Sequence, residues 1–87
     1  MQSNNEEKLL INSLTSLEVG IDVIKNTVKT LPNQPGIYKM VSAASKVIYI
    51  GKAKDIKKRV ISYSHTDRLT NRIKRMVSEI QTIEIVT

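Results

Sequence analysis

Residues 36–51 read Gly-Ile-Tyr-Lys-Met-Val-Ser-Ala-Ala-Ser-Lys-Val-Ile-Tyr-Ile-Gly, and this stretch decides the fold. Its two ends, residues 36–41 and 46–50, are rich in β-branched and aromatic side chains, and a short polar segment separates them. That pattern predicts a β-hairpin. Each strand carries one tyrosine, Tyr38 in the first and Tyr49 in the second. The hairpin therefore brings two phenols onto neighbouring strands.

Side chains alternate between the two faces of a strand, so both phenols are expected on the same face of this hairpin, within reach of each other. Strict alternation places Met40 beside Tyr38 on that face, and Val47 beside Tyr49. The opposite face is expected to carry Ile37, Lys39 and Val41 from the first strand, and Ile48 and Ile50 from the second.

Two helices and a third strand are expected after the hairpin. Asp55 is a good N-cap for a helix over residues 56–63. Apolar residues at helical spacing predict a second helix over residues 68–80, and alternation predicts a strand over residues 82–87. The pattern is that of a small α/β domain in which helices flank a sheet.

Ahead of the hairpin, residues 1–31 are expected to form a helical leader to a domain over residues 32–87. Capping-box spacing recurs at Ser3 and at Thr15, so one long helix and two short ones both stay open. The leader carries one apolar stripe, and we favour its packing on the chain's own domain over a coiled-coil seam with a second copy. The stripe comprises Leu10, Leu14, Leu17, Ile21, Ile24 and Val28.

Charge is distributed unevenly along the 87 residues, whose net charge is +6. Residues 1–35 hold three Lys and four acidic residues, which leaves eleven Lys and Arg against four acidic residues in residues 36–87. A basic domain of this kind predicts a polyanionic partner, with nucleic acid the leading candidate.

Composition excludes several classes of protein. The absence of cysteine excludes disulfides and cysteine-ligated zinc. No apolar run approaches the roughly 20 residues that span a bilayer, and the acidic start is unlike a secretory signal. A cytoplasmic protein without membrane association is therefore expected.

Both tripeptides, Gly36-Ile37-Tyr38 and Tyr49-Ile50-Gly51, stand in a wider pattern. Leu31-Pro32-Asn33-Gln34-Pro35 precedes the first, and Lys52-Ala53-Lys54-Asp55 follows the second. From about residue 20 onward the chain resembles the GIY-YIG nuclease family. More narrowly, it is similar to the N-terminal nuclease domain of excinuclease ABC protein C, from bacterial nucleotide excision repair.

This resemblance implies an α+β domain with a three-stranded antiparallel sheet flanked by helices. It implies hydrolysis of a DNA phosphodiester on the 3′ side of a lesion, with one divalent cation, Mg²⁺ or Mn²⁺, in the intact domain. The implied partners are damaged double-stranded DNA and, through a longer parent protein, the A and B proteins of the excinuclease.

The resemblance also implies a role for each site residue. Tyr49 would be the general base that takes a proton from water, with Tyr38 positioning water or phosphate beside it. Lys52 and Arg59 would stabilise charge on the scissile phosphate, and Tyr63 would help to orient the site. The physical chemistry agrees in direction, because nearby cations favour a phenolate and a guanidinium can grip two phosphate oxygens. Gly51 is expected to turn the chain sharply and bring Lys52 back over the sheet.

Other basic residues are expected to contact DNA phosphates without a catalytic role. They are Lys54, Lys57, Lys58, Arg68, Arg72 and Arg75. His65, in a polar loop, is interpreted as a surface residue rather than a proton carrier.

The family's metal-binding carboxylate is a Glu on a later helix, in a segment that would begin past Thr87. Glu79 and Glu84 are the late carboxylates that could replace it, although surface charge is the simpler interpretation of both. The 87 residues alone are therefore expected to hold no cation tightly and to be weak or inactive as a nuclease. The alternative is a non-catalytic basic module that binds DNA or docks a partner.

Overall fold

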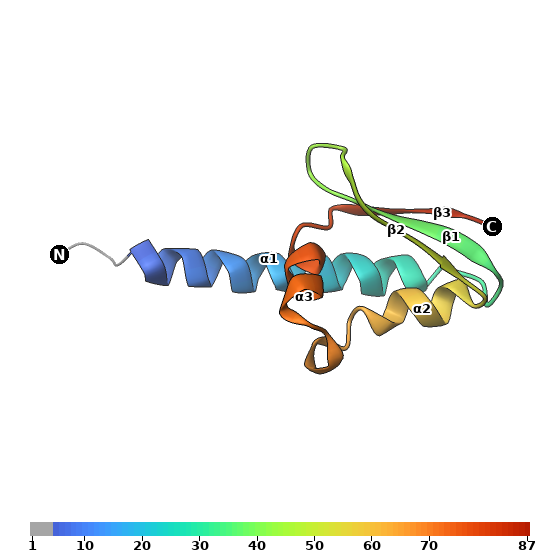
Figure 1. Cartoon of the computed structure of the whole chain (residues 1–87), viewed down its shortest axis with the longest axis horizontal. Helices are drawn as coiled ribbons and strands as arrows, with labels where there is room; N and C mark the ends of the chain where they lie inside the picture. The colour runs from blue at the N-terminus through green and yellow to red at the C-terminus, as the bar shows by residue number, and fades with distance from the viewer. Residues whose placement is uncertain (1–4) are drawn as a thin grey trace.

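The computed structural model describes the backbone of residues 5–87 and the side chains of residues 16–87. Three antiparallel strands form one sheet in the order β2-β1-β3, and the helices lie together on one side of it (Figure 1). This confirms the predicted α+β fold. The elements in chain order are α1 (Asn5–Val28), β1 (Gly36–Val41), β2 (Val47–Ala53), α2 (Ile56–Ser62), the 3₁₀ helix η1 (Thr66–Arg68), α3 (Asn71–Ser78) and β3 (Thr82–Val86).

The central strand β1 fixes which side chains share the covered face of the sheet. Met40 pairs with Tyr49 of β2, and Tyr38 pairs with Gly51 of β2 and with Ile85 of β3. Tyr38 and Met40 are buried. Both phenols therefore lie on the face that the helices cover, as alternation predicts.

Strict alternation is wrong at the start of β2. Met40 pairs with Tyr49 but Val41 pairs with Val47, so Ile48 is an extra residue in a β-bulge. The consequence is visible in the burial of the side chains. Ile48 packs against the core, whereas Ile50 is 61% exposed, so the two do not share a face as expected. Val47, expected beside Tyr49, is 42% exposed.

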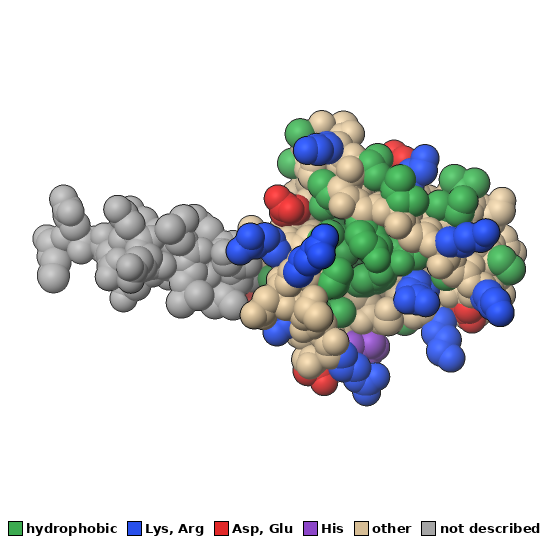
Figure 2. Space-filling view, in the orientation of Figure 1, with side chains coloured by type: hydrophobic (Ala, Val, Ile, Leu, Met, Phe, Trp, Pro, Cys, Tyr) green, Lys and Arg blue, Asp and Glu red, His purple; other side chains and the backbone are tan. Residues whose placement is uncertain are grey.

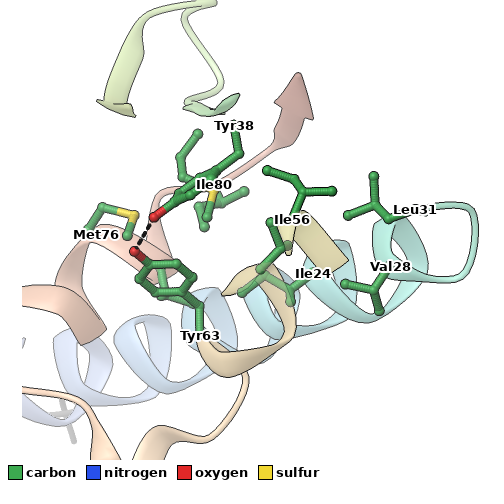
Figure 3. Packing of buried hydrophobic residues seen from close by; sticks show 11 residues of the cluster. Ile24, Val28, Leu31, Tyr38, Ile56, Tyr63, Met76 and Ile80 are labelled. Atoms are coloured by element: carbon green, nitrogen blue, oxygen red, sulfur yellow. Dashed lines mark hydrogen bonds between the residues drawn. The ribbon is translucent and has the colours of Figure 1, made fainter. Parts of the chain in front are cut away.

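The core fills the space between the covered face of the sheet and the helices (Figure 3). Ile24 and Val28 of α1 are both buried in it, so this part of the apolar stripe packs on the chain's own domain. Leu10 and Leu14, also assigned to the stripe, lie outside the residues whose side chains the structure describes. Over the described backbone, α1 is a single helix and not two short ones.

Gly20 marks a close crossing of α1 and α3. A Cβ atom at Gly20 would lie 1.9 Å from the carbonyl oxygen of Val77. Only a residue without a side chain permits this approach, because real Cβ contacts are much longer. Gly20 thus has a packing role that the apolar pattern of α1 does not reveal.

The helices that follow the hairpin begin at side-chain caps. The Asp55 carboxylate accepts a hydrogen bond from the Lys58 amide at 3.0 Å, as predicted for the start of α2. The predicted helix over 68–80 is wrong at its start, because Arg68 belongs to the 3₁₀ helix η1. The true α3 begins after Thr70, whose hydroxyl accepts from the Ile73 amide at 3.2 Å.

No helix among the described residues packs on the opposite face of the sheet. Ile37, Ile50 and Val86 are exposed there, and Lys39 pairs with Glu84 across β1 and β3. This is a row of apolar side chains interrupted by charge. None of the described helices combines the length and the apolar character needed to cross a membrane.

Candidate functional site

Three tyrosines from three elements meet beneath the sheet. Tyr38 comes from β1, Tyr49 from β2 and Tyr63 from the C-terminal end of α2. Their ring centroids lie 6.2 Å apart for Tyr38 and Tyr49, 5.8 Å for Tyr38 and Tyr63, and 6.1 Å for Tyr49 and Tyr63. We call this group the tyrosine cluster. Aromatic rings at these separations stabilise one another.

Within the tyrosine cluster, Tyr38 and Tyr63 form a buried pair. Their hydroxyl oxygens lie 2.7 Å apart and point toward each other in Figure 3, with Met76 close by. Tyr38 is 2% exposed and Tyr63 is 7% exposed, whereas Tyr49 is only half-buried. Tyr49 is therefore the member of the cluster that a substrate in solvent can reach.

Burial keeps the inner pair protonated. It raises the pKa of Tyr38, and the hydrogen bond to Tyr63 and the charge of Arg59 oppose this shift without cancelling it. Burial, reinforced by the hydrogen bond to Tyr38, raises the pKa of Tyr63 strongly. Both residues are neutral phenols at neutral pH, so they can hold and orient groups but do not supply a base.

The absence of a side chain at Gly51 leaves room for the Tyr38 ring. The strand β2 continues to Ala53, so the expectation that Gly51 turns the chain is wrong. A Cβ atom at Gly51 would lie 2.0 Å from Tyr38 Cζ and 2.1 Å from the Tyr38 hydroxyl oxygen. The glycine is needed because the phenol of the neighbouring strand lies directly over it.

A basic hollow of about 550 Å³ lies where β2 meets α2. Lys52 and Arg59, expected at the scissile phosphate, both line it. The Asp55 carboxylate is the anion in its wall, and hydrogen bonds from the Lys58 amide and Asn33 lower the pKa of that group. The full lining is Lys52, Ala53, Lys54, Asp55, Lys58, Arg59 and Ser62. Lys57 is not part of it.

A second hollow, of about 710 Å³, lies between β2 and α3, and we call it the β2–α3 groove. Tyr49 lines this groove and not the basic hollow, so the structure places the expected base and the expected phosphate cations in two different hollows, both of which β2 lines. The lining is Ile48, Tyr49, Thr70, Arg72, Ile73, Arg75, Met76 and Glu79. Figure 2 shows hydrophobic surface in the middle of this face with Lys and Arg on both sides.

Four of the groove's lining residues were not expected at a site. Ile48, Thr70, Ile73 and Met76 carry no signal in the sequence that separates them from core or capping residues. Of the arginines expected to contact DNA, Arg72 and Arg75 line the groove, whereas Arg68 lies in η1 outside both hollows.

The side chains that the structure describes do not form a cluster of metal ligands. Within residues 16–87, no three His, Asp or Glu side chains lie close enough to share a cation. Glu79 is at the C-cap of α3 and lines the β2–α3 groove, while Glu84 faces the uncovered side of the sheet. His65 is exposed in the loop before η1.

Comparison with known proteins places this geometry in a family. The family model of the UvrC-like GIY-YIG domain matches residues 34–87, which include the hairpin, the tyrosine cluster and both hollows. The chain belongs to the UvrC-like GIY-YIG family.

Curated relatives agree with this assignment. The UvrABC system protein C of Paramagnetospirillum magneticum is 47% identical over 76 residues, which are 87% of this chain and 12% of that protein. That of Mesorhizobium japonicum is 53% identical over 68 residues, 78% of this chain and 10% of that protein. The chain thus spans only about a tenth of the length of these relatives.

Solved structures of the family share the fold. The GIY-YIG N-terminal endonuclease domain of UvrC from Thermotoga maritima, bound to magnesium as its catalytic divalent cation, is 30% identical with a TM-score of 0.62. The match covers 72% of this chain and 67% of that domain. Three further structures of that domain, each with one tyrosine changed to phenylalanine, match with the same TM-score of 0.62 at 28% identity.

A side chain at position 51 should break the tyrosine cluster. In Gly51→Ala the new methyl group overlaps the Tyr38 ring, and overpacking of this kind costs about 1–3 kcal/mol. We expect a lower Tm in thermal unfolding followed by circular dichroism. Ile50→Ala, at the exposed neighbouring position, is the control and should change stability by less than about 0.5 kcal/mol. Equal stability of both variants would contradict the account of Gly51.

Removal of either hydroxyl of the buried pair should leave the other without a partner. We expect Tyr38→Phe and Tyr63→Phe each to lower the free energy of unfolding by about 1–3 kcal/mol, and the double variant to lose less than their sum. Urea unfolding of the four proteins of this cycle measures the coupling. Ile50→Ala, at an exposed position outside the tyrosine cluster, is the control. Strictly additive losses would show that the hydrogen bond contributes nothing.

Alkaline pH should destabilise the fold through the same two phenols. Below about pH 10 they keep their protons both folded and unfolded, whereas above it only the unfolded chain releases them. The free energy of unfolding should therefore fall as the pH rises above about 10.

The double variant Tyr38→Phe/Tyr63→Phe isolates this effect from the titration of lysines. Its free energy of unfolding should fall less between pH 9 and pH 11, a range set to bracket the reference tyrosine value of about 10. An identical pH dependence in the parent chain and the double variant would contradict the assignment of this destabilisation to Tyr38 and Tyr63.

Proposed function

We propose that this chain is part of a DNA endonuclease domain that cuts the phosphodiester backbone 3′ to a lesion during nucleotide excision repair. Membership of the UvrC-like GIY-YIG family supports the reaction class. The observation that carries the proposal is the position of Tyr49. It is the half-buried member of a cluster of three phenols, and it lies on the strand that lines both cation-bearing hollows.

In this proposal Tyr49 reacts as its phenolate, whose oxygen accepts the proton of the attacking water. The water oxygen forms the new bond to phosphorus as the bond to the leaving oxygen breaks, the leaving oxygen takes a proton from solvent, and negative charge accumulates on the phosphate in the transition state. Lys52 and Arg59 stabilise that charge from the basic hollow. Tyr38 and Tyr63 act as neutral phenols that hold the Tyr49 ring in place.

The proposed intact domain uses one divalent cation, Mg²⁺ or Mn²⁺, by analogy with the magnesium bound to the Thermotoga maritima domain. The side chains described for this chain do not form a cation site, since no three potential ligands come together. We therefore assign no step to the metal. We propose that the 87 residues alone cleave DNA weakly or not at all.

DNA would follow the basic side chains on both sides of Tyr49. Lys54 and Lys58 line the basic hollow, and Arg72 and Arg75 line the β2–α3 groove. Lys57 and Arg68 lie outside both hollows and would contact phosphates farther away. The partners proposed for the parent protein are damaged duplex DNA and the other proteins of the UvrABC system. The division into a leader over 1–31 and a domain over 32–87 stays a prediction.

A non-catalytic DNA-binding module is the second candidate. The observation that favours it is the lack of a three-ligand metal cluster among the described side chains. The two candidates differ in what Tyr49 does, because a binding module needs the phenol only as a contact surface.

Tyr49→Phe separates the two candidates. The protein to test is the chain extended at Thr87 by the segment that follows in a UvrABC system protein C relative, assayed on nicked duplex DNA with Mn²⁺. Under the nuclease proposal, loss of the general base lowers the cleavage rate by about 10²-fold or more, while the Kd for DNA changes little. Ile50→Ala is the matched control on the same strand, at an exposed position.

The outcomes are distinct. Cleavage that persists in Tyr49→Phe would contradict the assigned base. Tight DNA binding without cleavage by any version would favour the binding module.

A further inference from the structure

The β2–α3 groove has two chemically different walls. Ile48 and Tyr49 supply the β2 side, and the α3 side combines the apolar Ile73 and Met76 with charged residues. Its volume of about 710 Å³ falls within the roughly 300–1,000 Å³ of sites that hold small organic ligands. Since Tyr49 also belongs to the tyrosine cluster, the groove begins at the proposed catalytic phenol.

The bulge in β2 creates this groove wall. Neighbouring residues on a regular strand point to opposite faces, so Ile48 and Tyr49 could not both line one hollow without an irregularity. The extra residue at Ile48 turns its side chain toward the covered face, where it packs against the core beside Tyr49. Bulges that re-aim a side chain are frequent next to active sites.

Charges on α3 favour an anion at one end of the groove. Arg72 and Arg75 are three residues apart, which puts both on one face of the helix, and both line the groove. Glu79 lines the groove four residues beyond Arg75, at the end of α3. An anionic group is therefore attracted toward Arg72 and Arg75 and repelled from Glu79.

We propose that the β2–α3 groove binds one unstacked nucleotide of the substrate strand, next to the phosphodiester at Tyr49. Its base lies against Ile48, Ile73 and the Tyr49 ring, and its phosphate contacts Arg72 and Arg75. The flat faces of nucleobases stack well on such surfaces, and guanidinium groups bind phosphate oxygens in pairs. The inference rests on the proposed function, since it is the scissile bond that places the nucleotide.

Binding of short single-stranded DNA to the 87-residue chain tests the proposal without requiring cleavage. The probe is a fluorescently labelled oligonucleotide, compared by anisotropy with an abasic oligonucleotide of equal length and charge. We expect the base-containing strand to bind about tenfold more tightly. Ile73→Ala should reduce this preference while leaving the salt dependence unchanged. Equal affinity for both strands would overturn the proposal.

The arginines are tested through the salt dependence of Kd. Removal of two phosphate contacts in Arg72→Ala/Arg75→Ala should lower the slope of log Kd against log salt by about 1.4. The matched control is Lys46→Ala/Lys74→Ala, which removes the same charge at positions that do not line the groove. An equal change of slope in both double variants would overturn the assignment. All variants must first unfold at a Tm close to that of the parent chain.

The binding experiments test the groove separately from the cleavage assay that tests the nuclease proposal. A base preference that depends on Ile73 supports the groove even if no version cleaves DNA, and in that case only the nuclease proposal fails. Tyr49-dependent cleavage without a base preference would leave the nuclease proposal standing and overturn the groove.

Discussion

Contact between the Tyr38 phenol and Gly51 is the constraint on which the rest of the site depends. Across the β1–β2 ladder, the ring occupies the space that any side chain at position 51 would need. Its hydroxyl then reaches Tyr63 at the end of α2 and forms a buried hydrogen bond of 2.7 Å. One side chain thereby ties the central strand, the edge strand and a helix together. The position of Tyr49 follows, because its ring packs against both partners.

Because the three tyrosines of the cluster are buried to different extents, these chemically identical side chains have different roles. The two enclosed phenols have raised pKa values and keep their protons, so their contribution is orientation. The third stands on the edge strand with solvent on one side. The groove that Tyr49 lines also carries Arg72 and Arg75 from α3, and further along β2 the basic hollow carries Lys52 and Arg59. Positive charge from three elements is thus available near the accessible phenol.

Much of the fold could be predicted from the sequence because the local signals agree with one another. The hairpin, the Asp55 cap and the third strand each have a local pattern, and β pairing of the two tripeptides puts Tyr38 and Tyr49 on one face. The roles of Gly20 and Gly51 could not be predicted, since each depends on an atom from another element. The bulge at Ile48 escaped prediction for a related reason. Alternation is a property of one strand, whereas a bulge belongs to the pairing of two.

Some residues of the site could not be predicted from the sequence either, again because their role depends on contacts between different elements. Lys52, Arg59 and the tyrosines stand out through a motif, but Ile73 and Met76 have the spacing of ordinary core residues. Only the position of α3 beside β2 shows that they also line a groove. Groove residues of this kind are recognised from packing and not from residue type.

Mapping of DNA contacts by NMR tests the central claim most directly. The chain, at 9.8 kDa, is small enough for assignment of its backbone amide signals, and a phosphorothioate-linked oligonucleotide resists hydrolysis. The account predicts the largest shifts around Tyr49, Lys52 and Arg59, continuing along α3. Shifts confined to the uncovered face of the sheet, around Ile37, Ile50 and Val86, would contradict it. DNA would then bind on the side of the sheet away from the tyrosine cluster.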